Sequence, residues 1–179
     1  MKTLLNSNSL RGPRGLVLTL SLTYVLLGRK SLSAHDAPSV PAGHAPPLLP
    51  ATILQLETVR QAASRFFDVQ VALDEGYIDI EVVIPHMGRH LLKPQLLDAH
   101  FELTQPELLV YEPDCDGSLR LVAVEYAVPT SLASKPPQGF IGDSDIWFND
   151  TGFKLWTLHA WVYDFNPAGV FEPFNPRLP

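Results

Sequence analysis

Three polar side chains stand where the surrounding sequence predicts apolar strands. His159 lies inside LWTLHAWVY (155–163), the most hydrophobic strand that the sequence predicts, and Glu125 shares a predicted strand face with leucine and alanine side chains. His90 follows Pro-His-Met-Gly, a turn signal that delivers a side chain from the end of a strand. Because a buried charge is costly unless it is paired, Glu125 needs a partner such as His159, His90 or an arginine.

Two interpretations of these three residues stay open. In the first, a buried Glu–His or Glu–Arg hydrogen bond fixes the register of the sheet. In the second, two histidines and a carboxylate from three segments form a metal centre, since this ligand set is typical of zinc and non-haem iron sites. The sequence thus gives His90, Glu125 and His159 as candidate metal ligands and a divalent metal ion as the candidate cofactor. Asp98 and His100, two residues apart, are a weaker addition to the same cluster.

No familiar catalytic motif accompanies these residues. The sequence has no GxSxG elbow, no HExxH, no phosphate-binding glycine loop and no CxxC. Cys115 is the only cysteine, which excludes an intrachain disulfide, and it has no basic neighbour to activate its thiol. Asn149-Asp150-Thr151 is an acceptor motif for N-glycosylation, which matters in a eukaryotic source. The sequence therefore names no catalytic residue and predicts no organic-cofactor site.

The first 34 residues are typical of a secretory signal peptide. Basic residues precede twelve uncharged ones, LVLTLSLTYVLL (16–27), and small residues follow. Twelve residues are too few to cross a hydrocarbon core of about 30 Å, which needs about 20. We therefore expect a signal peptide over 1–34 and a secreted or periplasmic protein without a stable membrane span. Arg29 and Lys30 leave open an uncleaved interfacial anchor or a misassigned start codon.

The charge of the mature chain argues against nucleic acid as a partner. Of the 13 basic residues, five lie before position 35 and no acidic residue does, so eight basic residues remain against 19 acidic ones. Nucleic acids and anionic lipids both need basic patches on the protein that binds them. The partners that stay open are a small ligand or a metal ion, and the sequence leaves the oligomeric state undetermined.

The mature chain divides into a linker and one domain. Residues 35–50 (HDAPSVPAGHAPPLLP) contain five prolines and no apolar periodicity, which predicts a Pro-rich disordered linker. Residues 51–179 are expected to form a single α+β domain. A domain of roughly 125 residues buries a core large enough to be stable without metals or disulfides.

The elements of this domain follow from its hydrophobic periods. Apolar residues recur at three- and four-residue steps from Thr52 to Leu73, which predicts one long N-terminal helix that ends at Gly76. Strands are predicted at 77–84, 107–112, 118–128 and 155–163. Asp116-Gly117 predicts a hairpin between the second and third of them. We therefore expect the helix to pack on an antiparallel sheet of about four to five strands, curled toward a half-barrel.

Two segments are predicted to lack regular structure. Residues 129–150 hold several prolines and glycines and show little pattern, which indicates a long loop. The C-terminal tail carries four prolines, so we expect it to be pinned across the domain by Phe165, Phe171 and Phe174.

Several motifs resemble a family of uncharacterised, predicted secreted proteins found mainly in bacteria. They are HMGRH, PELLVYEPDCDGSLRLVAVEYAVP and LHAWVYDFNPAGVFEPFNP, and the resemblance spans about residues 65–176. The resemblance places His90, Glu125, Tyr126, His159 and Trp161 on the motif positions of that family. It brings no established activity. Family members often carry a cysteine before the MG-x-H turn, and this chain has none there.

The sequence alone supports three functional hypotheses. The first is an exported ligand- or metal-binding domain, and the second is a small extracytoplasmic metalloenzyme that uses the His/Glu/His cluster. The third is a structural or interaction protein whose histidines are only core residues. An open coordination position facing a cleft favours the second hypothesis, whereas a dry, closed Glu–His contact favours the third.

Overall fold

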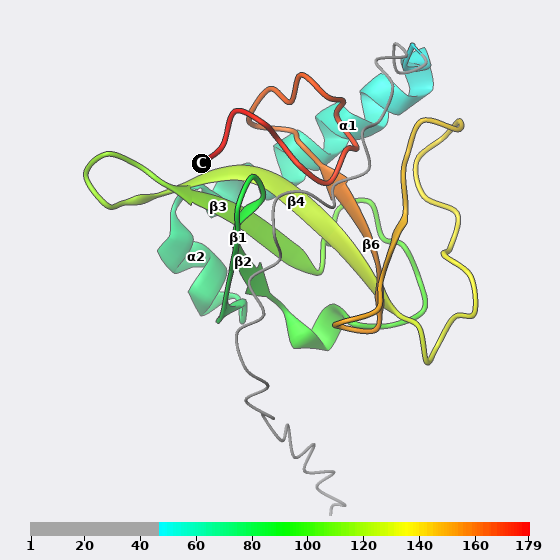
Figure 1. Ribbon diagram of the computed structural model, residues 1–179, viewed down its shortest axis with the longest axis horizontal. Helices are drawn as coiled ribbons and strands as arrows, with labels where there is room; N and C mark the ends of the chain where they lie inside the picture. Colours follow the sequence, from blue (N-terminus) through cyan, green and yellow to red (C-terminus); the bar gives the residue numbers. More distant parts are fainter. Residues whose placement is uncertain (1–46) are drawn as a thin grey trace, which may run out of the picture. The chain divides into compact units, whose positions relative to one another are not determined.

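A six-stranded antiparallel sheet organises the part of the chain that the computed structural model describes, residues 47–179 (Figure 1). Its strands are β1 (Ile78–Ile84), β2 (Gly88–Leu92), β3 (Leu108–Pro113), β4 (Leu119–Pro129), β5 (Phe148–Asp150) and β6 (Leu155–Ala160). They lie in the order β1-β2-β3-β4-β6-β5. The sheet curls like a half-barrel, which confirms the predicted α+β class, although it has six strands instead of four or five.

The described domain begins slightly earlier than the sequence predicts. Pro50, assigned to the linker, is the first residue of helix α1, and Leu48 packs against the hydrophobic core. Proline suits the first turn of a helix because its missing N–H would have no intrahelical partner there. The predicted signal peptide and the rest of the predicted linker lie outside the described residues.

The prediction of one long helix is wrong. The segment forms α1 (Pro50–Ala63), the 3₁₀ turn η1 (Ser64–Phe67) and the short helix α2 (Val69–Asp74). The break falls at Asp68, whose backbone is extended and whose side chain accepts a hydrogen bond from the Gln70 N–H. Such an N-cap starts a new helix. Apolar periodicity continues across the break because both helices contribute buried side chains to the same core.

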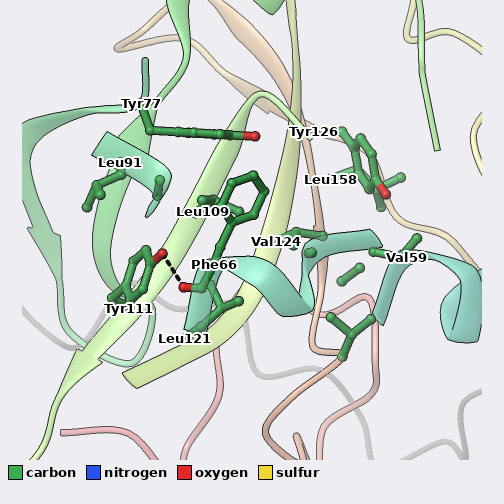
Figure 2. Packing of buried hydrophobic residues seen from close by; sticks show 14 of the residues in the cluster. Val59, Phe66, Tyr77, Leu91, Leu109, Tyr111, Leu121, Val124, Tyr126 and Leu158 are labelled. Atoms are coloured by element: carbon green, nitrogen blue, oxygen red, sulfur yellow. Dashed lines mark hydrogen bonds between the residues drawn. The ribbon is translucent and has the colours of Figure 1, made fainter. Parts of the chain in front are cut away.

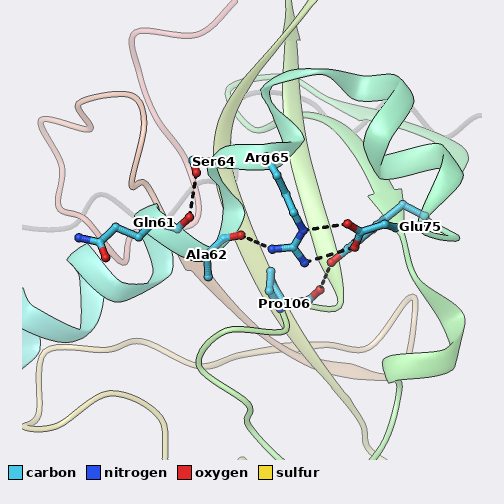
Figure 3. A network of polar contacts seen from close by, with 7 residues as sticks. Gln61, Ala62, Ser64, Arg65, Glu75 and Pro106 are labelled. Atoms are coloured by element: carbon cyan, nitrogen blue, oxygen red, sulfur yellow. Dashed lines mark hydrogen bonds and ion pairs between the residues drawn. The ribbon is translucent and has the colours of Figure 1, made fainter.

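An arginine bridges the break between these helical pieces (Figure 3). The Arg65 guanidinium donates to both carboxylate oxygens of Glu75, at 2.9 and 3.2 Å, and also to the Ala62 carbonyl. The hydrogen bond from Arg65 lowers the pKa of Glu75. Both side chains are partly exposed, so this pair links α2 to η1 but contributes little to stability.

The core lies between the helical segment and one face of the sheet (Figure 2). Phe66 points from η1 into this core, where its ring meets Tyr77 edge-on at 5.1 Å. The Tyr111 hydroxyl donates to the Phe66 carbonyl at 2.7 Å, which ties β3 to the helical layer. Buried tyrosines need such partners because an unpaired hydroxyl is costly inside a protein.

Three of the four predicted strands are confirmed as β1, β3 and β4, and the fourth is β6, which ends at Ala160 rather than at 163. β6 lies second from the edge and pairs with β5 only over its first residues. The sequence missed β2 and β5. β2 is five residues long and opens on Gly-Arg-His, and β5 has only three residues, so neither shows a readable period.

The predicted hairpin between β3 and β4 is confirmed. Gly117 adopts φ 84°, and its N–H donates to the Asp114 carbonyl at 2.9 Å. A Cβ added at Gly117 would meet no atom within 4 Å, so only the backbone conformation selects glycine here.

We therefore expect Gly117→Val to lower the free energy of unfolding by roughly 1–2 kcal/mol, because a β-branched residue resists positive φ. Gly117→Asn is the matched control, since asparagine tolerates the left-handed region and should cost less. Chemical denaturation of both variants measures the difference. Equal losses would show that φ is not the reason for this glycine.

The C-terminal tail carries an internal duplication that the sequence analysis overlooked. The tripeptide Phe-Asn-Pro occurs at 165–167 and at 174–176. The side-chain amide of Asn166 donates to the Phe174 carbonyl, and the side-chain amide of Asn175 donates to the Phe165 carbonyl. Reciprocal hydrogen bonds therefore join the two copies. The prediction that three phenylalanines pin the tail holds for the buried Phe171 and is wrong for Phe165 and Phe174, which are exposed.

Candidate metal centre

Three separate strands carry the candidate ligands to one face of the sheet. His90 lies in β2, Glu125 in β4 and His159 in β6, where Glu125 and His159 are direct cross-strand partners. The residues next to them, among them Val124 and Leu158, belong to the core under the helices. Because side chains alternate along a strand, the three candidate ligands point to the opposite face.

The three side chains converge. The Nε2 atom of His90 lies 3.6 Å from Oε2 of Glu125, and Nδ1 of His159 lies 3.6 Å from Oε1 of the same carboxyl. One ligand atom from each residue lies within 4.8 Å of the others. All three residues are buried, with relative exposures of 3%, 5% and 2%. Within the described residues, Glu125 forms no ion pair with an arginine, so the Glu–Arg alternative finds no support.

These separations differ from those of a hydrogen-bonded cluster. Hydrogen bonds between nitrogen and oxygen are typically about 2.7–3.2 Å long and weaken beyond that, and 3.6 Å is too long for one. Ligand atoms about 2.0–2.2 Å from a tetrahedral zinc ion lie roughly 3.4 Å from each other. Each histidine thus lies slightly beyond this ligand spacing from a different oxygen of the Glu125 carboxyl, and outside hydrogen-bond length.

The ring of His90 is held in a defined tautomer. Its Nδ1 atom lies 3.3 Å from the Val82 carbonyl in β1, which can only accept a hydrogen bond. This contact favours the tautomer with its proton on Nδ1, which directs the lone pair of Nε2 toward Glu125. Histidines that bind metals usually donate their second ring N–H in this manner. The corresponding nitrogen of His159, Nε2, is buried and has no hydrogen-bond partner.

Burial dominates the electrostatics of the cluster. It raises the pKa of Glu125 to about 8, against the lowering effect of the nearby Thr157 side chain. Burial also lowers the pKa of His159 to about 3, and the neighbouring His90 adds to this effect. The pKa of His90 is lowered by burial as well. All three groups therefore favour their neutral forms at neutral pH while no cation is among them.

The surroundings of the cluster are apolar. The Trp161 ring stacks on His159 with a centroid distance of 6.2 Å, and Trp161 packs with Val110 and Ala123 on the same face. Leu178 of the C-terminal tail joins this group. The tail is held beside the cluster because the His86 N–H donates to a backbone oxygen of Pro179 at 2.8 Å. Such a shell keeps the local dielectric low.

No protein-family model matches this chain, and searches among curated proteins and among solved structures also find no match. The candidate site therefore rests on its geometry alone. The resemblance to a family of predicted secreted proteins remains an expectation from the motifs.

The other residues that the sequence analysis raised lie apart from this cluster. Asp98 and His100 have mostly exposed side chains, 3.6 Å apart, and they do not belong to the buried group. Cys115 is exposed in the hairpin loop. His90 lies in the middle of a strand, not after a turn at a strand end as predicted. Between residues 47 and 179, no helix is long and apolar enough to cross a membrane.

A second buried carboxyl, Glu107, escaped the sequence analysis. It is 2% exposed, and its Oε2 atom accepts a hydrogen bond from the Ala127 N–H at 3.0 Å, beside the start of β3. Burial raises the pKa of Glu107 to about 8. The only sequence feature that pointed to a buried carboxyl here was a charged residue at the start of an apolar strand.

Glu107 should make stability depend on pH. Its folded pKa lies above the ordinary value of 4.5, so the folded state keeps a proton that the unfolded state loses between pH 4.5 and about 8. Its contribution therefore diminishes as the pH rises, by at most about 1.4 kcal/mol per pH unit. We expect Glu107→Gln to gain stability relative to the wild type between pH 6 and 8. Denaturation at several pH values checks this, and a pH-independent difference would contradict it.

Proposed function

We propose that this domain binds one divalent transition-metal ion, with zinc as the first candidate, between His90, Glu125 and His159. The observation that carries the proposal is the 3.6 Å separation of Glu125 from each histidine. A purely structural contact between a buried carboxyl and an imidazole would close to hydrogen-bond length, because unsatisfied buried groups are costly. Two histidines and a carboxylate are a ligand set that zinc and iron(II) accept.

The charge state of the cluster supports the same conclusion. Without a cation, burial disfavours both an ionised Glu125 and protonated histidines. A divalent ion reverses the preference of the carboxyl, since metal binding displaces its proton and ligates the anion. The neutral histidines already have the form that a metal requires. On metal binding, only Glu125 therefore has to lose a proton.

The number of ligands favours a small metalloenzyme as the second candidate function. Three protein ligands leave a tetrahedral ion one position for water or substrate, as in catalytic zinc sites, whereas structural zinc sites have four protein ligands. The near-complete burial of all three ligands favours the binding role. Cobalt(II) substitution separates these functions. A spectrum that changes when a small anion is added indicates an open position, and an unchanged spectrum indicates a closed one.

Metal content and stability test the proposed function together. We expect protein produced without a histidine tag to contain about one equivalent of zinc or a related ion. A chelator should then lower the melting temperature, and zinc should restore it. Zinc at 100 times its dissociation constant adds about 2.7 kcal/mol. For a domain of this size, that is on the order of 10 °C. Metal-free protein whose melting is insensitive to zinc would refute the proposal.

We also propose that the domain works after export, as a secreted or periplasmic protein. The support is the apolar run with basic residues before it and small residues after it. Mass spectrometry of the mature N-terminus is expected to show that about 33 residues are removed. A cytosolic protein that retains Met1 would contradict export, and it would leave the metal site unaffected.

A further inference from the structure

Strand β1 contains an irregularity directly beside the candidate ligand His90. Asp79 pairs with Leu91 and Val82 pairs with His90, so Ile80 and Glu81 have no partner in β2. Glu81 adopts φ 57°, in the left-handed region that residues with a Cβ seldom enter. Such outliers persist only where their surroundings enforce them, and they gather at functional sites. We call the segment from Asp79 to Val82 the β1 bulge.

Asp79 holds the β1 bulge in place. Its Oδ1 atom accepts a hydrogen bond from the Glu81 N–H at 2.8 Å, which supports the unusual backbone of that residue. Its Oδ2 atom accepts another from Nε of Arg89 at 2.7 Å. Arg89 immediately precedes His90 in β2. A single carboxylate therefore fastens the bulge to the strand that carries the ligand.

The bulge supplies the carbonyl that orients His90. In a regular antiparallel pair, backbone carbonyls accept from the backbone N–H groups of the neighbouring strand. A bulge disrupts this ladder locally and turns the backbone. Val82, the first residue after the unpaired ones, lies opposite His90, and its carbonyl is 3.3 Å from Nδ1 of the imidazole ring. Nε2 is thereby left free to face Glu125 at 3.6 Å.

We propose that the β1 bulge, held by Asp79, positions His90 as a metal ligand by fixing its ring orientation and its Nδ1–H tautomer. The inference rests on the proposed metal site. Groups that orient metal-bound histidines typically change the metal affinity 10- to 100-fold when they are removed. Asp79 touches no ligand atom, so it is a positioning residue.

The competing explanation is protection of a sheet edge. β1 is an edge strand, and bulges are one means by which proteins prevent edge-to-edge pairing. Under that explanation, loss of Asp79 promotes association between molecules, while the tautomer of His90 and the metal affinity stay unchanged. The two explanations therefore differ in a measurable way.

The test compares Asp79→Ala with Asp79→Asn, which keeps an oxygen able to accept from Glu81. Two readouts apply: the zinc affinity by competition with a chromophoric chelator, and the His90 tautomer by nitrogen NMR of the metal-free protein. We expect Asp79→Ala to weaken zinc binding about 10- to 100-fold and to lose the pure Nδ1–H tautomer. Asp79→Asn should stay within a few-fold of the wild type. Glu75→Ala, which removes another partly exposed Arg–carboxylate pair, should change neither readout.

A second pair of variants covers the case in which Asp79→Ala does not fold. Glu81 is exposed, so Glu81→Gly relaxes the backbone at little cost, whereas Glu81→Val resists positive φ. We expect only Glu81→Val to weaken zinc binding and to alter the tautomer. If the wild type binds zinc and the Asp79 and Glu81 variants bind it equally well, this inference is wrong and the proposed metal site is unaffected. Wild-type protein that binds no zinc would overturn both.

Discussion

Glu125→Gln is expected to abolish tight zinc binding, with a loss larger than the roughly 10- to 100-fold that follows removal of a group that only orients a ligand. The amide has almost the shape of the carboxyl, but it carries no charge and is a poor ligand for zinc. In the metal-free protein Glu125 is buried, and its pKa is raised to about 8. A neutral glutamine should therefore not destabilise the metal-free domain, and like Glu107→Gln it should gain stability relative to the wild type as the pH rises toward 8.

The matched control for this variant is Glu107→Gln. Both glutamates are buried and both have a raised pKa, but Glu107 contacts the backbone of Ala127 and lies outside the cluster. Zinc affinity and melting with and without a chelator are measured for each variant. We expect zinc to stabilise Glu107→Gln as it does the wild type, and to have no effect on Glu125→Gln. Equal zinc responses in all three proteins would place the ion elsewhere.

Gly88→Ala is expected to be the most destabilising single substitution near the site, by roughly 3 kcal/mol or more. Gly88 begins β2 with φ 107°, a conformation that strains any other residue. An added Cβ would also lie 2.6 Å from the Tyr111 carbonyl oxygen and 3.2 Å from a methyl group of Val110. The first contact is with backbone, which cannot rotate away. β2 must therefore shift, and His90 moves with it.

Gly117→Ala separates the two causes of this loss. Gly117 also has a positive φ, but an added Cβ meets no atom within 4 Å. This control should cost only about 1–2 kcal/mol, the conformational part. Chemical denaturation gives both values, and the zinc affinity should fall for Gly88→Ala alone. Similar losses for the two variants would mean that β3 does not pass Gly88 as closely as the structure indicates.

The convergence of the three polar residues followed from one physical argument about the sequence. An acidic side chain on an apolar strand is tolerated only beside a compensating group, so Glu125 required a partner on another strand. His159 was the natural choice because its own strand is equally apolar. The two are direct cross-strand neighbours in the structure. The sequence could not supply the 3.6 Å separations, because they depend on the register between strands and on side-chain rotamers.

Other features were not readable from local sequence. β2 owes its place to pairing with β1 and β3, and its five residues carry no period of their own. The β1 bulge was hidden because IDIEVVI alternates well enough to suggest a regular strand, while the ladder skips two of its residues. The helix break at Asp68 was misread because an apolar stripe continues across an N-cap. Tertiary contacts decide the first two features, whereas the helix break is a local N-cap signal that the continuing apolar stripe concealed.

Anomalous diffraction from crystals of the zinc-loaded protein tests the central claim most directly. Data collected on both sides of the zinc absorption edge locate the ion without any assumption about its ligands. We predict one strong peak about 2.0–2.2 Å from Nε2 of His90, a carboxylate oxygen of Glu125 and Nδ1 of His159. Zinc found only at exposed residues such as His100, with the three buried side chains in direct hydrogen-bond contact, would contradict the account.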